Sequence, residues 1–145
     1  MSSEREPFFA AIARIVAGLV FIVAGFGKLV VLPIVARLRP GIPTFAAVLA
    51  AVHVPLPFLT SLAVCTLEIV GGVALLTRRF VRPASALLAL DMLGALISLS
   101  VPATFFHRPV VLGSITLGNE IWRVPLEVSL FLALLWLARL RTKSL

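Results

Sequence analysis

The sequence predicts an all-α integral membrane protein: a four-helix bundle of membrane spans, with a short extra helix in the first outer loop. Composition is the first observation behind this prediction, because 61% of the 145 residues are hydrophobic, only 13% are charged, and the mean hydropathy is +1.14. Soluble domains are about 45–50% apolar and about 25% charged. The second observation is four apolar segments, each long enough to cross a bilayer. They leave no room for a soluble catalytic domain, so we expect one transmembrane domain over residues 1–145.

The first predicted span covers residues 8–32 and ends before Pro33. Arg14 interrupts its apolar run and no small-residue cleavage site follows, so we interpret it as a retained helix and not as a signal peptide. Residues 33–57 are rich in proline and contain one apolar patch, residues 44–53, that is too short to cross. With Thr44 as N-cap, this patch predicts a short helix at the membrane surface or tucked over the bundle.

Prolines mark the remaining spans. The second span covers residues 57–77, and the third covers residues 83–104, opening at Pro83 and bending near Pro102. A connector of residues 105–119 leads to the fourth span, residues 121–140, in which Pro125 either opens the helix or kinks it.

Lysine and arginine counts in the connections predict the orientation. The N-terminal segment, the second loop and the C-terminal segment together carry seven of these residues, against four in the first and third loops. The positive-inside rule then places both termini in the cytoplasm. The net charge of +7 follows from the same clustering at span ends, so we do not expect nucleic acid as a partner.

Charged side chains inside the apolar spans are the third observation, and they indicate where a site would lie. The first span holds Arg14 and Lys28, the second Glu68, the third Asp91 and the fourth Glu127. An ionisable residue in the middle of a bilayer costs roughly 2.5–3.5 kcal/mol on insertion scales. Each of these residues shares a helical stripe with small or polar side chains. We therefore expect all of them to face the interior of the bundle.

Depth along each helix, at ~1.5 Å per residue, predicts which of these side chains meet. Arg14 and Asp91 are expected to pair toward the cytoplasmic side, with Glu68 just beyond them near the bilayer centre.

Toward the outer side, Lys28 and Glu127 are expected to form a second pair, with Arg123 nearby. Two interpretations of the whole set stay open. The charges either form structural ion pairs that fix helix register, or line a polar cavity that binds a ligand headgroup or relays protons. Glu68 and Asp91 carry the second hypothesis, because their short side chains cannot snorkel to the surface as long basic side chains do.

Several chemistries lack the residues that they need. Cys65 is the only cysteine, which excludes an internal disulfide and a cysteine-based metal site. His53 and His107, the only histidines, fall in different outer connections, so we expect no metal site and no haem. The sequence contains neither a phosphate loop nor a dinucleotide-binding fingerprint. We expect the chain alone to hold no redox cofactor.

Three segments carry a resemblance to a known family. They are RIVAGLVFIVAGFGKL at residues 14–29, LEIVGG at residues 67–72 and DMLGA at residues 91–95. An acidic residue opening the last apolar helix belongs to the same pattern, and Glu127 fits that position better than Glu120. With these motifs in this order, the chain resembles the DoxX family of small four-helix membrane proteins.

This resemblance implies an accessory subunit of a quinone-linked oxidoreductase or respiratory complex, in a bacterial or archaeal cytoplasmic (inner) membrane. The charged positions of the family's motifs correspond here to Arg14, Lys28 and Glu68. The implied pocket would hold a quinone or a lipid headgroup: Lys28 or Arg14 would hydrogen-bond a quinone carbonyl, while Glu68 or Asp91 exchanges a proton. Membrane lipid and other redox-complex subunits would be the partners, and no independent enzymatic activity is expected. The alternative is a non-catalytic structural or assembly subunit of a larger membrane complex.

Overall fold

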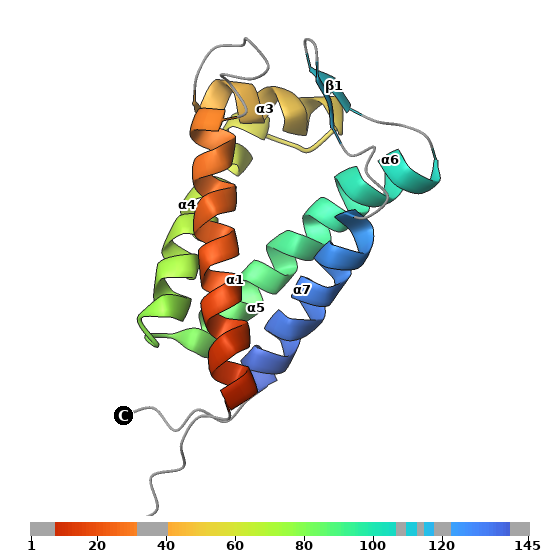
Figure 1. The fold of residues 1–145 in the computed structure, drawn as a ribbon. Coiled ribbons are helices and arrows are strands. Elements are labelled where there is room, and N and C mark those ends of the chain that lie inside the picture. The colour runs from red at the N-terminus through yellow and green to blue at the C-terminus, as the bar shows by residue number, and fades with distance from the viewer. Residues whose placement is uncertain (1–7, 32–40, 107–109, 113–114, 118–122, 140–145) are drawn as a thin grey trace, which may run out of the picture.

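The computed structural model describes residues 8–31, 41–106, 110–112, 115–117 and 123–139, and it confirms the predicted all-α bundle (Figure 1). The bundle consists of four helices: α1 (Phe8–Phe26), α4 (Pro57–Leu76), α5 (Val81–Ala95) and α7 (Arg123–Arg139). They form a closed ring, because α1 and α5 each pack against both α4 and α7.

Three helical stretches in the described part of the chain are long and apolar enough to cross a membrane: Phe8–Leu29, Pro57–Leu76 and Val81–Ser100. They overlap the first three predicted spans, whose exact bounds stay a prediction. Helix α7 has 17 described residues, so the fourth span stays a prediction. The start of α1, the end of α7 and the turn between α4 and α5 all lie at one end of the bundle (Figure 1).

Two π-helical turns extend the spans at the opposite end. Turn η1 (Gly27–Val31) continues α1, and η2 (Leu96–Ser100) joins α5 to α6 (Val101–Phe105). The helical path therefore passes Pro102. A proline ring crowds the carbonyl four residues earlier, and the wider turn just before Pro102 makes room for it.

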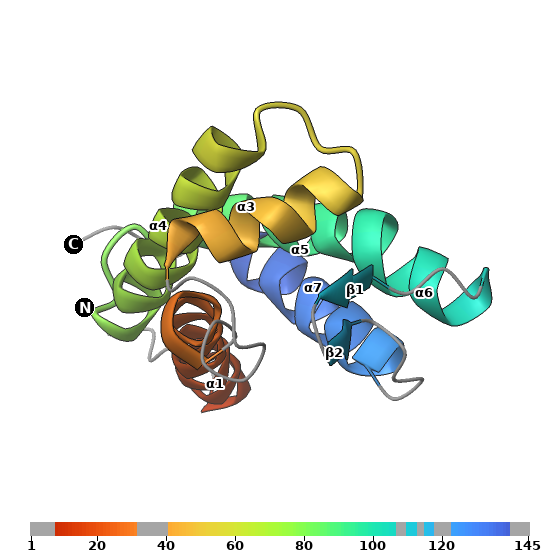
Figure 2. The same cartoon turned by 90° about the horizontal axis from the view of Figure 1, so that it is seen from above.

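Helix α3 (Ile42–Ala51) confirms the short extra helix and lies across the end of the bundle that carries the π turns (Figures 1 and 2). The prediction of Thr44 as its N-cap is wrong. Gly41 holds that position with a φ of 89°, a left-handed conformation that glycine adopts freely. Pro43 fits in the first turn of the helix, where main-chain N–H groups have no partner within the helix and a proline therefore loses no hydrogen bond. The helix consequently begins before Thr44.

A small hairpin lies in the predicted connector before α7. Strands β1 (Val110–Leu112) and β2 (Ile115–Leu117) pair in antiparallel fashion. β-Branched residues favour such strands, and they were the signal in the sequence.

Two apolar clusters hold the ring together. The larger one joins Ala17 and Phe21 of α1 to α4, α5 and α7, and the smaller one joins Phe45 and Val48 of α3 to Cys65 of α4. Lys28, described below, contacts the smaller cluster through Phe45.

Candidate functional site

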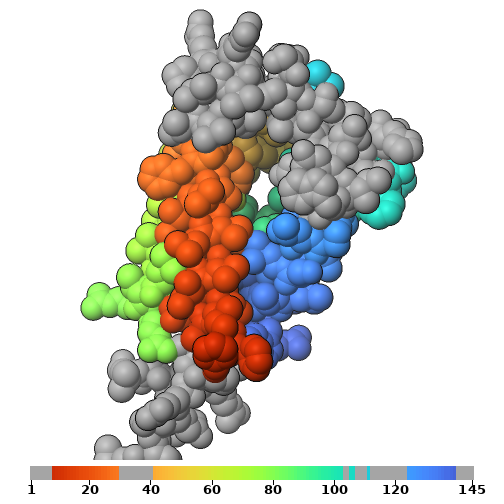
Figure 3. All heavy atoms as spheres, viewed as in Figure 1, coloured from red at the N-terminus to blue at the C-terminus, as the bar shows by residue number. Residues whose placement is uncertain are grey.

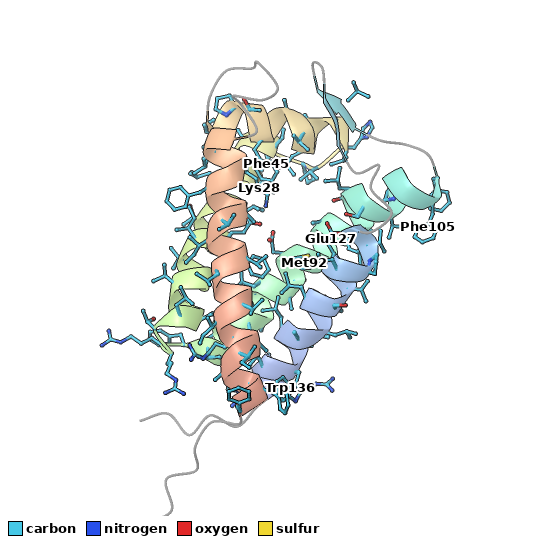
Figure 4. All side chains as sticks on the ribbon, viewed as in Figure 1. Lys28, Phe45, Met92, Phe105, Glu127 and Trp136 are labelled. Atoms are coloured by element: carbon cyan, nitrogen blue, oxygen red, sulfur yellow. The ribbon has the colours of Figure 1, made fainter. Side chains whose placement is uncertain are left out.

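A salt bridge between Lys28 and Glu68 is the centre of the site. The Nζ atom of Lys28, on η1, donates to Oε1 of Glu68, on α4. The same Nζ lies 5.1 Å from the centroid of the Phe45 ring on α3, within the range of a cation–π interaction. Figure 4 shows Lys28 reaching inward beneath Phe45. One ammonium group therefore ties together α1, α3 and α4.

The two partners differ in exposure. The Glu68 side chain is 4% exposed, whereas that of Lys28 is 27% exposed. Oε2 of Glu68 is buried and accepts no hydrogen bond within the described part of the chain. Buried carboxylate oxygens are normally hydrogen-bonded, so an orphaned one requires an explanation.

The predicted pair of Lys28 with Glu127 is wrong, because Lys28 pairs with Glu68. Gly18 and Gly25 share a helical stripe with Lys28 and both contact α4, so this stripe faces Glu68 and not α7. Glu127 is 8% exposed and lies on the interior side of α7 (Figure 4). The side chain of Arg123 lies outside the described residues, so its position near Glu127 stays a prediction.

Asp91 joins the site from α5. It is partly buried and lies within electrostatic range of Lys28 and Glu68. No side chain in the described segments donates a hydrogen bond to its carboxylate. The contact of Lys28 with Glu68 is therefore the part of the site that a direct ion pair carries, and a shared pocket with Asp91 stays a prediction.

Arg14 has a different role from the one predicted. It is 5% exposed and its guanidinium donates to the carbonyl oxygens of Leu75 and Leu76, the latter at 3.1 Å. These carbonyls belong to the last turn of α4, which lacks intrahelical donors and carries the negative end of the helix dipole. Arg82 donates similarly to the carbonyl of Ala138 near the end of α7, at 3.2 Å.

The predicted pair of Arg14 with Asp91 is therefore wrong. Every residue carries a main-chain carbonyl, so the pattern of side chains could not show which of them would accept from Arg14. Arg14 stabilises the contact between α1 and α4, and it leaves Lys28 as the cation of the interior site.

A hollow opens beside the site. Figure 3 shows it between α1 and α7, beneath α3, and Lys28 lies at this level in the same view (Figure 4). Met92 and Glu127 lie on the opposite side, from α5 and α7 (Figure 4). Gly94 of α5 is exposed on the same face as Leu90 and Ile97, so the open space at its missing side chain lies on the outer surface of the helix.

Phe45 and Met92 are site residues that sequence reasoning missed. Phe45 is 8% exposed and covers Lys28, while Met92 packs partly against the larger apolar cluster. An aromatic residue in the short helix was the available signal for Phe45. Together with Lys28 and Asp91 these residues offer a donor, acceptors and apolar walls, which suits an amphipathic head group.

Fold and site together define a small membrane protein whose helical bundle holds a buried ion pair beside an opening between helices. The DoxX family matches residues 9–107, well over half of the chain, and the chain therefore belongs to the DoxX family. The matched region includes Arg14, Lys28, Glu68 and Asp91, and it ends before Glu127. Comparisons with curated proteins and with solved structures give no match.

Proposed function

We propose that this DoxX protein is an accessory subunit of a quinone-linked oxidoreductase or respiratory complex in a bacterial or archaeal cytoplasmic membrane, and that its interior site holds the quinone head group. The observation that carries the proposal is the Lys28–Glu68 pair beside the hollow. A buried ion pair with one oxygen left without a donor is costly in a membrane. A ligand that hydrogen-bonds there would offset part of this cost.

The residues fit such a head group. Lys28 retains N–H donors for a carbonyl oxygen, and Asp91 and Glu68 can hold a proton at their carboxylates. Phe45 and Met92 offer apolar contact for a ring, and the helix faces suit an isoprenoid tail. When bound, a quinone supplies a carrier of two electrons and two protons. Because the chain shows no obvious cofactor motif, we assign electron delivery to a partner subunit.

A quinone-binding measurement tests the proposal. The protein would be placed in lipid nanodiscs and titrated with short-chain ubiquinone and menaquinone analogues, each in both redox forms. We expect saturable binding by the wild type and a loss of about 10-fold in affinity in Glu68→Gln, since a lost hydrogen bond to a charged group costs about 1.5–3 kcal/mol. The control is Ser129→Ala, whose exposed hydroxyl donates only to its own helix, at the Pro125 carbonyl. Equal, weak binding by all three proteins would reject the pocket.

A structural or assembly role is the second candidate. It is favoured by the geometry of Lys28, which joins three helices, and of Arg14, which joins α1 to the end of α4. In this case the charges only lock the bundle, and the protein docks onto a larger complex without binding quinone. Native purification in mild detergent, with identification of co-eluting subunits, tests the partner that both candidates require.

A further inference from the structure

The end of the bundle opposite α3, where α4 turns into α5 and α7 ends, is strongly basic. Its exposed arginines, within the described part of the chain, are Arg78, Arg79, Arg82 and Arg139. The carboxylates that the structure describes, on Glu68, Asp91 and Glu127, lie about two helical turns or more from this end. Basic span ends follow from membrane topology alone, so a binding site here needs a more specific geometry than charge.

The guanidinium of Arg82 supplies that geometry, because it is anchored to the neighbouring helix. Its Nε atom donates to the carbonyl oxygen of Ala138, in the last turn of α7, at 3.2 Å. The other N–H donors are on the two terminal amino groups, which make no hydrogen bond to any described residue. These groups form a planar fork that matches two oxygens of a phosphate. The bond at Nε therefore holds a phosphate-binding fork at the junction of α5 and α7.

A second positive charge lies at the adjoining position. Arg139 directly follows Ala138 and its side chain is exposed. A zwitterionic phospholipid would bring its own ammonium group to this junction, and like charges repel each other at short range. A phosphate diester without such a cation is attracted by both arginines. The junction is therefore complementary to a head group with a net negative charge.

The level of the junction in the membrane fits a lipid phosphate. Trp136 of α7 lies at the same end of the bundle (Figure 4) and is 42% exposed. Tryptophan is enriched at the membrane–water interface, where lipid head groups lie. The Arg82 fork is thus expected at the depth at which phospholipids carry their phosphates.

An exposed apolar surface continues from this junction toward the middle of the membrane. Arg82 begins a helical stripe on α5 that includes Leu90 and Ile97, which are 66% and 62% exposed. On α7, Leu132 lies seven residues before Arg139, on the same face of the helix, and is 57% exposed. A ligand that joins an anionic head to an acyl chain would use both parts of this surface, whereas free phosphate would use only the first.

We propose that the junction of α5 and α7 binds an anionic phospholipid, with the Arg82 fork on its phosphate diester and an acyl chain along the exposed stripe of α5. The site is separate from the Lys28–Glu68 pair, and the inference does not depend on quinone binding. Arg82 is the residue that fixes the head group, and Arg139 favours a net negative charge.

Native mass spectrometry of delipidated protein in detergent measures this binding. Phosphatidylglycerol and phosphatidylethanolamine with identical acyl chains would be titrated separately. We expect phosphatidylglycerol to bind at least about 5-fold more tightly, since each basic residue near the surface favours an anionic lipid. Glycerophosphoglycerol, the same head group without chains, should not displace the lipid even in large excess.

Three variants separate a fixed site from diffuse charge. Arg82→Gln should weaken phosphatidylglycerol binding about 10-fold, because charge-assisted hydrogen bonds to the phosphate are lost. Arg82→Lys keeps the charge but loses the fork and the Nε anchor, so it should weaken binding at least about 3-fold. The matched control is Arg79→Gln, which removes the same charge from the same end and should change the affinity less than about 2-fold.

Equal losses in Arg79→Gln and Arg82→Gln, or wild-type affinity in Arg82→Lys, would show that only diffuse charge attracts the lipid and would overturn the site. Equal affinities for the two lipids would overturn the preference for an anionic head. Displacement by glycerophosphoglycerol would make the ligand a soluble phosphate and overturn the lipid. Should Arg82→Gln not fold, the comparison of Arg82→Lys with Arg79→Gln decides.

Discussion

A methyl group at position 72 probes the contact on which the interior site depends, the close approach of α1 and α4. A Cβ atom on Gly72 would lie 2.7 Å from the carbonyl oxygen of Gly18 and 3.2 Å from the main-chain nitrogen of Ile22. Both are main-chain atoms, so α1 itself must move. Overpacking costs about 1–3 kcal/mol, and replacing glycine by alanine inside a helix returns up to ~1 kcal/mol. With main-chain atoms in the way we take the upper half of that cost, so Gly72→Ala should lower the free energy of unfolding by about 1–2 kcal/mol.

Reversible unfolding with SDS in mixed micelles, followed by circular dichroism, measures this change. Gly94→Ala is the matched control, because its added methyl group meets no atom within 4 Å. It should leave stability unchanged or raise it by up to ~1 kcal/mol. If Gly72→Ala proves as stable as Gly94→Ala, the two backbones are not in contact and the geometry of the Lys28–Glu68 pair loses its support.

Three further predictions concern single side chains. Arg14→Met should lower the free energy of unfolding by about 2 kcal/mol in the same SDS assay, because it removes charge-assisted hydrogen bonds to the end of α4. An unchanged free energy of unfolding would contradict the stabilising contact between Arg14 and α4. Lys28→Met alone should destabilise by about 3–5 kcal/mol by leaving Glu68 buried and unpaired, and adding Glu68→Leu should recover most of that loss. Recovery of stability without recovery of quinone binding would favour the pocket over a purely structural pair, whereas no recovery at all would speak against the pair. Cys65 is 2% exposed and packs beneath α3, so a maleimide should label it at least about 10-fold more slowly in native protein than after SDS unfolding; equal rates would mean that α3 does not cover it.

Helix positions could be predicted from the sequence because local chemistry determines them. Pro57 begins α4 as expected, and Pro83 lies in the first turn of α5, which begins at Val81. The cost of a bare charge in a membrane also predicted that Glu68 would face inward, and it is almost fully buried.

The partners of the charges could not be predicted because they depend on geometry that side-chain spacing does not encode. Packing decides which neighbour the stripe of Gly18, Gly25 and Lys28 faces; it faces α4, and the partner of Lys28 is therefore Glu68 in place of Glu127. The acceptors of Arg14 are main-chain carbonyls, which every sequence contains. Phe45 belongs to a helix whose position across the bundle depends on packing, so its contact with Lys28 emerged only in three dimensions.

Photolabelling in native membranes tests most directly whether one interior site receives the quinone head. An azido-quinone would be activated in membranes that contain the protein, and the labelled peptides would be identified by mass spectrometry with and without excess unlabelled quinone. We predict protectable labelling near Phe45 and Met92, whose side chains border the Lys28 ammonium and the hollow. Labelling confined to outward-facing positions such as Leu19 and Val23, or labelling that excess quinone does not suppress, would contradict the account.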